Sequence, residues 1–215
     1  PPLRHYRTAI FEKHFDPPSI WKKLSVKTLN LFEKIQDDSR WNGIERYSSG
    51  IREKHISSFL GRQVPVATEF RGVINPLDID EYQERSGFSA LKKCLGSLSP
   101  VDVIQEIKES GLRGRGGGGF PTGVKWDLVA GEKAPVKYVI CNGDEGDPGA
   151  FMDRMLLESY PYRVIEGMLI AAYAVGASEG FFYIRAEYPL AVSRIRQAIE
   201  HCREAGYIGE NILGS

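Results

Sequence analysis

The second half of the chain alternates between short apolar runs and longer amphipathic or apolar segments. Residues 137–141 (KYVIC) and 180–185 (GFFYIR) are short apolar runs, which are typical of buried strands. The largely apolar residues 160–175 predict a buried helix between them, and residues 189–205 predict an amphipathic helix that ends at Gly206. Strand, helix, strand and helix at this spacing predict an α/β fold with adjacent parallel strands and right-handed crossovers.

The region before this alternation contains one well-marked helix. Ser99 suits the N-cap, Pro100 suits the first helical position, and Gly111 lies where a left-handed residue would end the helix. Residues 80–85 predict a shorter helix, and the alternating apolar pattern of residues 64–68 predicts a short strand.

The N-terminal part differs from the rest in composition and periodicity. Its first 60 residues contain eleven Lys or Arg and seven Asp or Glu, and three of the four histidines. We interpret residues 1–71 as a mostly helical N-terminal extension of unclear role and residues 72–215 as one domain. The histidines are more readily explained as surface or partly buried residues than as ligands, since no second ligand recurs at metal-binding spacing.

Charge and cysteine content narrow the function classes. The 28 Lys and Arg residues balance the 28 Asp and Glu residues, which argues against a nucleic-acid partner. The three cysteines are widely spaced, with no CxxC motif, which argues against a disulfide framework or a cysteine-only metal site and favours a cytoplasmic location. The longest apolar run, residues 164–175, is too short to span a bilayer, so we expect no direct membrane insertion. The chain starts at Pro1, which indicates a processed product or a piece of a longer protein.

A glycine-rich segment precedes the first predicted strand. Residues 114–119 (GRGGGG) satisfy GxGxxG, but the dinucleotide fingerprint requires a strand before it and a helix after it, whereas here a helix precedes and the next residues resemble a loop. The P-loop pattern also fails, because its lysine arrives one place late at Lys125. Consecutive glycines still let backbone N–H groups approach a ligand, and Arg113, Arg115 and Lys125 supply cations, which suits a phosphate or a flat heterocycle. The alternative is a flexible linker.

An acidic loop follows directly on the first predicted strand. It contains Asn142, Asp144, Glu145 and Asp147, and ligands of open α/β sheets bind beyond the carboxyl ends of the strands. These side chains can accept hydrogen bonds from ribose hydroxyls or ring N–H groups, or hold a metal ion; the alternative is a solvated turn. Because one loop offers cations and N–H groups and the other offers acceptors, we predict that both face one cavity.

Two long motifs carry a resemblance to a known family. Residues 110–126 (SGLRGRGGGGFPTGVKW) and 141–154 (CNGDEGDPGAFMDR) resemble the flavoprotein subunits of the complex I 51-kDa family. This family includes the NADH-binding subunit of respiratory complex I and the diaphorase subunits of NAD-linked hydrogenases and formate dehydrogenases. The resemblance covers residues 72–215, and residues 80–95 are more similar to the soluble hydrogenase and formate dehydrogenase subunits.

The resemblance implies a Rossmann-like flavin- and NADH-binding domain, with FMN against the glycine-rich loop and NADH stacked on the flavin. Phe120 would stack on the adenine of the nicotinamide cofactor, Asp147 would accept its ribose hydroxyls, and Lys125 and Glu145 would tune the potential of the flavin. No catalytic acid or base and no metal ligand is assigned, because hydride transfer to a flavin does not demand one. The cofactor-binding residues carried over from the family are Gly114, Arg115, Gly116, Gly117, Phe120, Lys125, Asn142, Asp144, Glu145 and Asp147.

The activity implied is that of an NADH dehydrogenase or diaphorase-type oxidoreductase subunit. It oxidises NADH by hydride transfer to FMN and passes electrons to iron–sulfur subunits of a hydrogenase, formate dehydrogenase or complex I-like assembly. In the family, a second glycine-rich loop, a β-grasp-like domain and a helical domain with a [4Fe–4S] cluster follow. We therefore expect a truncated domain, an iron–sulfur cluster only in the missing C-terminal part or in partner subunits, and weak or no FMN binding by the chain alone. The alternatives are a non-catalytic structural or binding subunit of such a complex and an NAD(P)-binding protein without flavin.

Overall fold

The computed structural model describes residues 62–70 and 73–214. Every described residue belongs to the unit Arg46–Ser215. Of the predicted extension, residues 1–71, the structure describes only residues 62–70, and its three histidines lie outside the described residues. The domain boundary at residue 72 stays a prediction.

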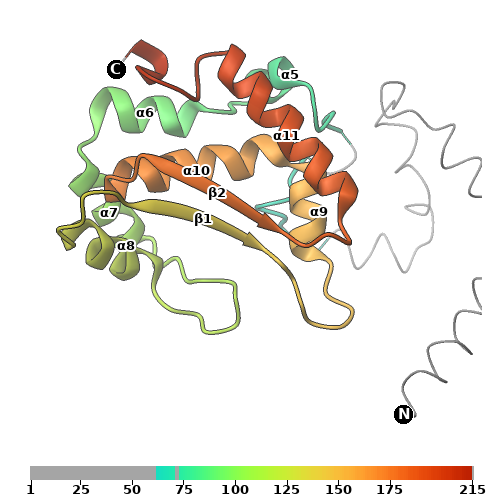
Figure 1. Cartoon of the computed structure of the whole chain (residues 1–215), viewed down its shortest axis with the longest axis horizontal. Coiled ribbons are helices and arrows are strands. Elements are labelled where there is room, and N and C mark those ends of the chain that lie inside the picture. Colours follow the sequence, from blue (N-terminus) through green and yellow to red (C-terminus); the bar gives the residue numbers. More distant parts are fainter. Residues whose placement is uncertain (1–61, 71–72, 215) are drawn as a thin grey trace, which may run out of the picture. The chain divides into compact units, whose positions relative to one another are not determined.

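The described part consists of helices packed on a two-stranded sheet (Figure 1). The strands β1 and β2 pair in parallel, with Tyr138 opposite Glu179 and Gly143 opposite Ile184, which confirms the predicted adjacent parallel strands. The elements are α5 (Ile79–Glu84), α6 (Ser89–Ser97), α7 (Pro100–Glu109), α8 (Thr122–Gly131), β1 (Tyr138–Gly143), α9 (Met152–Ser159), α10 (Pro161–Val175), β2 (Glu179–Ile184), α11 (Pro189–Glu204) and a final 3-10 turn (Ile212–Gly214).

The two faces of the sheet differ in burial. One face packs on α10, and Cys141 and Phe182 lie against a buried cluster that includes Leu157 and Ile195. The opposite face is exposed: Tyr138, Ile140, Phe181 and Tyr183 expose 52%, 64%, 51% and 59% of their surface. The prediction that residues 137–141 form a buried strand is therefore wrong for this face, because an apolar run does not reveal whether a second layer covers it.

Hydrogen bonds to one buried carboxylate connect α10 to the N-terminus of α6. The carboxylate of Glu166, on α10, is buried and accepts hydrogen bonds from the Tyr82 hydroxyl at 2.6 Å, the Phe88 N–H at 2.9 Å and the Leu91 N–H at 3.2 Å. Phe88 is fully buried and stacks on Tyr207 with ring centroids 3.9 Å apart. Since burying an unpaired carboxylate is very unfavourable, these three donors are what allows Glu166 to sit in the core.

Local signals located several helix ends correctly. Ser99 caps α7 in a capping box with Asp102, and Gly111 has a left-handed φ of 65°. The short helix α5 is also confirmed, with Asp78 as its N-cap. The predicted strand at residues 64–68 is wrong: this segment is irregular, and its two valines are 87% and 78% exposed, because no strand in the described part of the chain pairs with it.

The helices α10 and α11 confirm the two helical predictions in the second half. Gly176 follows α10 and Gly206 follows α11 after Ala205, and their left-handed φ values are 72° and 76°. The helices α6, α8 and α9 were not predicted. Strand β1 also continues through Asn142 and Gly143, which the sequence analysis assigned to the loop. No helix within the described residues is long and apolar enough to cross a membrane.

Candidate functional site

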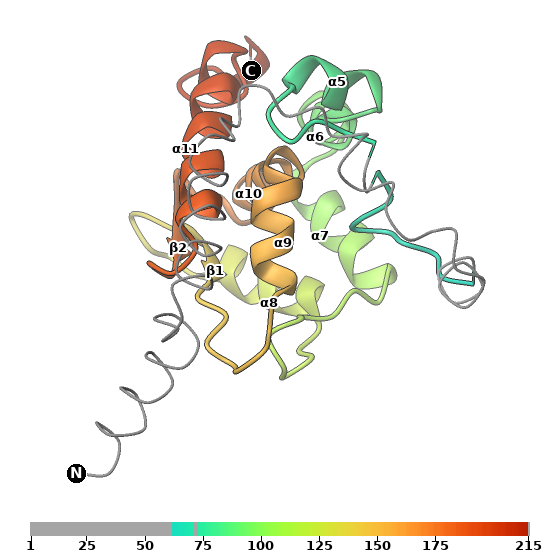
Figure 2. The same ribbon diagram turned by 90° about the vertical axis from the view of Figure 1, so that its right-hand side faces the viewer.

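The glycine-rich loop joins α7 to α8 and closes at its base. The Gly114 N–H donates to the Phe120 carbonyl at 2.9 Å, and the Thr122 N–H donates to the Leu112 carbonyl at 2.9 Å. These two hydrogen bonds define a narrow neck, so the residues between them form a compact projecting loop. In Figures 1 and 2 this loop projects from the lower side of the domain.

The tip of the loop is exposed and needs glycine for its conformation. Gly117 and Gly119 have left-handed φ values of 95° and 59°, which side chains rarely adopt. A Cβ added at Gly116, Gly117 or Gly118 would meet no atom within 4 Å, so space around the tip is open. The Arg115 guanidinium folds back and donates to the carbonyl of Arg113 at 3.0 Å. The tip therefore presents backbone groups that no neighbouring side chain covers.

The loop does lead into a helix, which corrects the expectation of loop structure after residue 119. Helix α8 begins at Thr122, and its N-cap, Pro121, provides no side-chain hydrogen bond. Gly123 lies so close to α7 that an added Cβ would sit 2.6 Å from both the backbone nitrogen and Cγ of Lys108. This close approach brings the N-terminus of α8, with its partial positive charge, to the base of the glycine-rich loop. The preceding element is the helix α7, so the strand required by the dinucleotide fingerprint is still missing.

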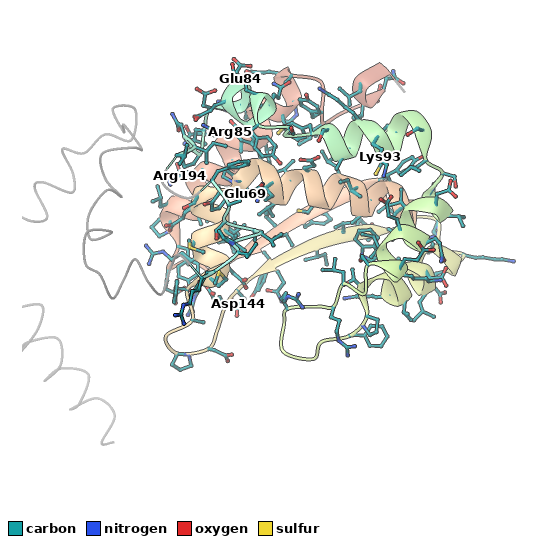
Figure 3. All side chains as sticks on the ribbon, turned by 180° about the vertical axis from the view of Figure 1, so that it is seen from behind. Glu69, Glu84, Arg85, Lys93, Asp144 and Arg194 are labelled. Atoms are coloured by element: carbon teal, nitrogen blue, oxygen red, sulfur yellow. The ribbon has the colours of Figure 1, made fainter. Side chains whose placement is uncertain are left out.

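The acidic loop leaves the carboxyl end of β1. Asn142, within β1, accepts a hydrogen bond on Oδ1 from the Asp144 N–H at 3.1 Å. Asp144 and Glu145 are half-buried, whereas Asp147 is exposed. This loop projects from the same side of the domain as the glycine-rich loop, and Figure 3 labels Asp144 there. That both loops line a single cavity stays a prediction.

The Glu145 side chain caps helix α9. Its Oε1 accepts from the Asp153 N–H at 2.8 Å and its Oε2 accepts from the Arg154 N–H at 3.0 Å. Burial alone would raise the pKa of Glu145, but these N–H groups and the Tyr188 hydroxyl, 3.1 Å from Oε2, together lower it below the usual range. The nearby Asp153 carboxyl has a raised pKa, first through burial and then through the charge of Glu145.

Two further residues at this loop were missed by the sequence analysis. Arg185, just after β2, donates to the backbone carbonyl of Glu145 at 2.9 Å, and Tyr188 contacts its carboxylate. Both residues could have been predicted from the expected topology. Parallel strands end at the same edge of a sheet, so residues that follow β2 should meet the loop that follows β1.

The predicted site residues are either exposed or half-buried in the structure, and none of them is deeply buried. Within the described part of the chain, no group of three or more His, Cys, Asp or Glu side chains could hold a metal ion. Asp144 and Glu145 are half-buried, and the exposed members are Gly114, Arg115, Gly116, Gly117, Phe120, Lys125, Asn142 and Asp147.

Comparison with known proteins supports the resemblance found in the motifs. Residues 107–212 match the family model of the Nuo51 FMN-binding domain, Complex1_51K. The chain is 52% identical over 154 residues to the NADP-reducing hydrogenase subunit HndC of Solidesulfovibrio fructosivorans, which covers 72% of this chain and 31% of that protein. It is 41% identical over 152 residues to an NADH-quinone oxidoreductase subunit of Escherichia coli (strain K12), which covers 70% of this chain and 34% of that protein.

A solved structure has a similar fold. A crystal structure of an NAD⁺-reducing [NiFe]-hydrogenase in the air-oxidized state matches with a TM-score of 0.52 and 36% identity, over 61% of this chain and 23% of that one. These matches confirm the predicted family resemblance and the Rossmann-like α/β class. The chain spans about a third of the length of the curated relatives that it matches.

Proposed function

We propose that the glycine-rich and acidic loops together bind FMN and that the chain acts as a flavoprotein subunit that oxidises NADH. The proposal starts from the match of residues 107–212 to the FMN-binding domain of the complex I 51-kDa flavoprotein family. The observation that carries this proposal is the arrangement of the glycine-rich loop. Its exposed tip leads through Phe120 and Pro121 to the N-terminus of α8, which has no side-chain cap, and the acidic loop projects from the same side.

The glycine-rich loop suits the phosphate of FMN. A helix N-terminus attracts anions through its free N–H groups and its dipole, and the neighbouring glycines allow close approach of the backbone. Lys125, in the first turn of α8, is exposed and adds a cationic donor near the same end of the helix. Gly114, Arg115, Gly116 and Gly117 supply the rest of this cradle.

The remaining predicted residues suit the flat and polar parts of the cofactors. The Phe120 ring is 53% exposed at the neck of the glycine-rich loop, where it can stack on the adenine of NADH. Asn142, Asp144 and Asp147 offer acceptors for ring N–H groups and ribose hydroxyls. When bound, FMN supplies the acceptance of a hydride and the release of single electrons, so we assign no catalytic acid or base to the chain.

The same proposal implies partner subunits that accept the electrons from the flavin. Electrons would leave through iron–sulfur subunits of a hydrogenase, formate dehydrogenase or complex I-like complex in the cytoplasm. The matched relatives include a hydrogenase subunit and a quinone oxidoreductase subunit, which supports this class of partner. The second candidate is a non-catalytic structural or binding subunit of the same class of complex.

A chimeric protein tests the catalytic proposal directly. Residues 72–215 replace the matched third of the HndC relative, so that the remaining part of a complete subunit is supplied. We expect bound FMN and NADH- or NADPH-dependent reduction of an artificial electron acceptor. Lys125→Ala in this protein should weaken FMN binding by about 1.5–3 kcal/mol, the range for a hydrogen bond to a charged group. The matched control, Lys133→Ala, removes an exposed lysine just after α8 and should leave FMN binding unchanged. A chimera that folds without binding FMN would favour the non-catalytic role.

A further inference from the structure

We propose that Arg185 and Tyr188 are positioning residues that clamp the acidic loop through Glu145 and thereby set the geometry of its ligand-binding side chains. This inference rests on the proposed flavin site and adds two residues to it. Arg185 follows the last residue of β2, and Tyr188 is the N-cap residue of α11 and is buried. Both residues therefore lie in the connection between β2 and α11, next to the acidic loop.

The clamp holds Glu145 by its side chain and by its backbone. The Tyr188 hydroxyl donates to Oε2 at 3.1 Å, alongside the two N–H groups of α9 that bind the same carboxylate. The Arg185 Nη1 donates to the carbonyl oxygen of Glu145 at 2.9 Å. A cap for α9 would need only the carboxylate. The bond from Arg185 to the carbonyl therefore serves the loop itself.

Stacking fixes the two clamp residues in turn. The guanidinium groups of Arg154 and Arg185 lie 5.3 Å and 5.5 Å from the centre of the Tyr188 ring, which is the distance range of cation–π contacts. Glu187 forms an ion pair with Arg185 at 3.3 Å. The clamp thus links β2 and α11 to the start of α9 through one buried aromatic ring.

The conformation of Glu145 explains why a clamp is needed. Its φ of 48° is in the left-handed region, which is unfavourable for residues other than glycine and persists only where the surroundings impose it. The carboxylate points to α9 and receives three donors, so Glu145 acts on the loop geometry. Its neighbours Asp144 and Asp147 are the carboxylates that remain to meet a ligand.

Hydrogen–deuterium exchange on the 215-residue chain tests the clamp without any ligand. Tyr188→Phe and Arg185→Gln should each speed exchange over residues 143–154 by about tenfold, the effect of losing one hydrogen bond to a charged group. Arg185→Lys keeps a cationic donor and should restore slower exchange in part. The controls are Tyr173→Phe, which loses the hydroxyl bond to the Leu98 carbonyl, and Arg203→Gln, which loses an exposed ion pair with Glu200. Both controls should leave residues 143–154 unchanged.

Titration of FMN into the chimera that contains residues 72–215, followed by flavin fluorescence, tests the positioning role. In the chimera, both clamp variants should bind FMN about tenfold more weakly than the unsubstituted protein, and Arg185→Lys should recover part of the affinity. Unaltered exchange over residues 143–154 in both variants would overturn the clamp, and faster exchange with unaltered FMN affinity would overturn its positioning role. If the chimera binds no FMN while the exchange result holds, the clamp stands and the flavin proposal is what fails.

Discussion

Gly123→Ala should disturb the packing that places the glycine-rich loop. The added Cβ would lie 2.6 Å from the Lys108 backbone nitrogen, where ordinary contact begins at 3.4 Å, so α7 and α8 must separate by about 0.8 Å. Overpacking of this kind typically destabilises a protein by about 1–3 kcal/mol. Because the clash includes backbone atoms of Lys108, rotation of a side chain cannot relieve it.

A matched substitution isolates this packing effect. Gly131 ends the same helix, and a Cβ there would meet nothing within 4 Å, so Gly131→Ala should stabilise the chain by about 0.5–1 kcal/mol. Both variants gain stability from replacing a helical glycine by alanine, so this gain largely cancels when their unfolding midpoints are compared. Urea unfolding followed by circular dichroism should give a lower midpoint for Gly123→Ala by roughly 0.5–1.5 M, for a slope of about 2 kcal/mol per molar urea. Equal midpoints for the two variants would show that α7 and α8 do not approach as closely as described.

Two further predictions concern the buried and capping carboxylates. Glu166→Gln should destabilise the chain by about 2–3 kcal/mol and Tyr82→Phe by about 1–2 kcal/mol, because both break charge-assisted hydrogen bonds in the core. Unfolding in urea measures both changes. An unaffected Glu166→Gln variant would mean that the carboxylate charge is not needed there. The folded state lowers the pKa of Glu145, so its capping of α9 contributes stability above the ordinary glutamate pKa of about 4.3 and loses it as the pH falls through the lower folded value. In NMR, the amide proton of Arg154 should titrate with that lowered midpoint, and Glu145→Gln should abolish the titration; a midpoint at or above the ordinary value would refute the assignment.

Two motifs predicted the two loops of the candidate site, and the roles of their residues in ligand binding stay predictions. Both loops were identified from their composition and from their positions next to predicted elements. The structure adds that the Glu145 carboxylate caps α9, and the predicted role of Glu145 at the flavin stays a prediction. Its carbonyl partner, Arg185, lies 40 residues away in the sequence, and no local pattern connects the two.

The sequence by itself determined the features that depend on neighbouring residues. The cap at Ser99, the left-handed glycines that follow α7 and α11, and the apolar runs of β1 and β2 act within one turn or one strand, so they can be recognised locally. Only the tertiary structure decided the rest. Helix α8 packs against α7 through the close approach at Gly123, and one face of the sheet stays exposed. Each of these depends on which distant surfaces meet, and hydrogen bonding and burial between such surfaces exist only once the chain has folded.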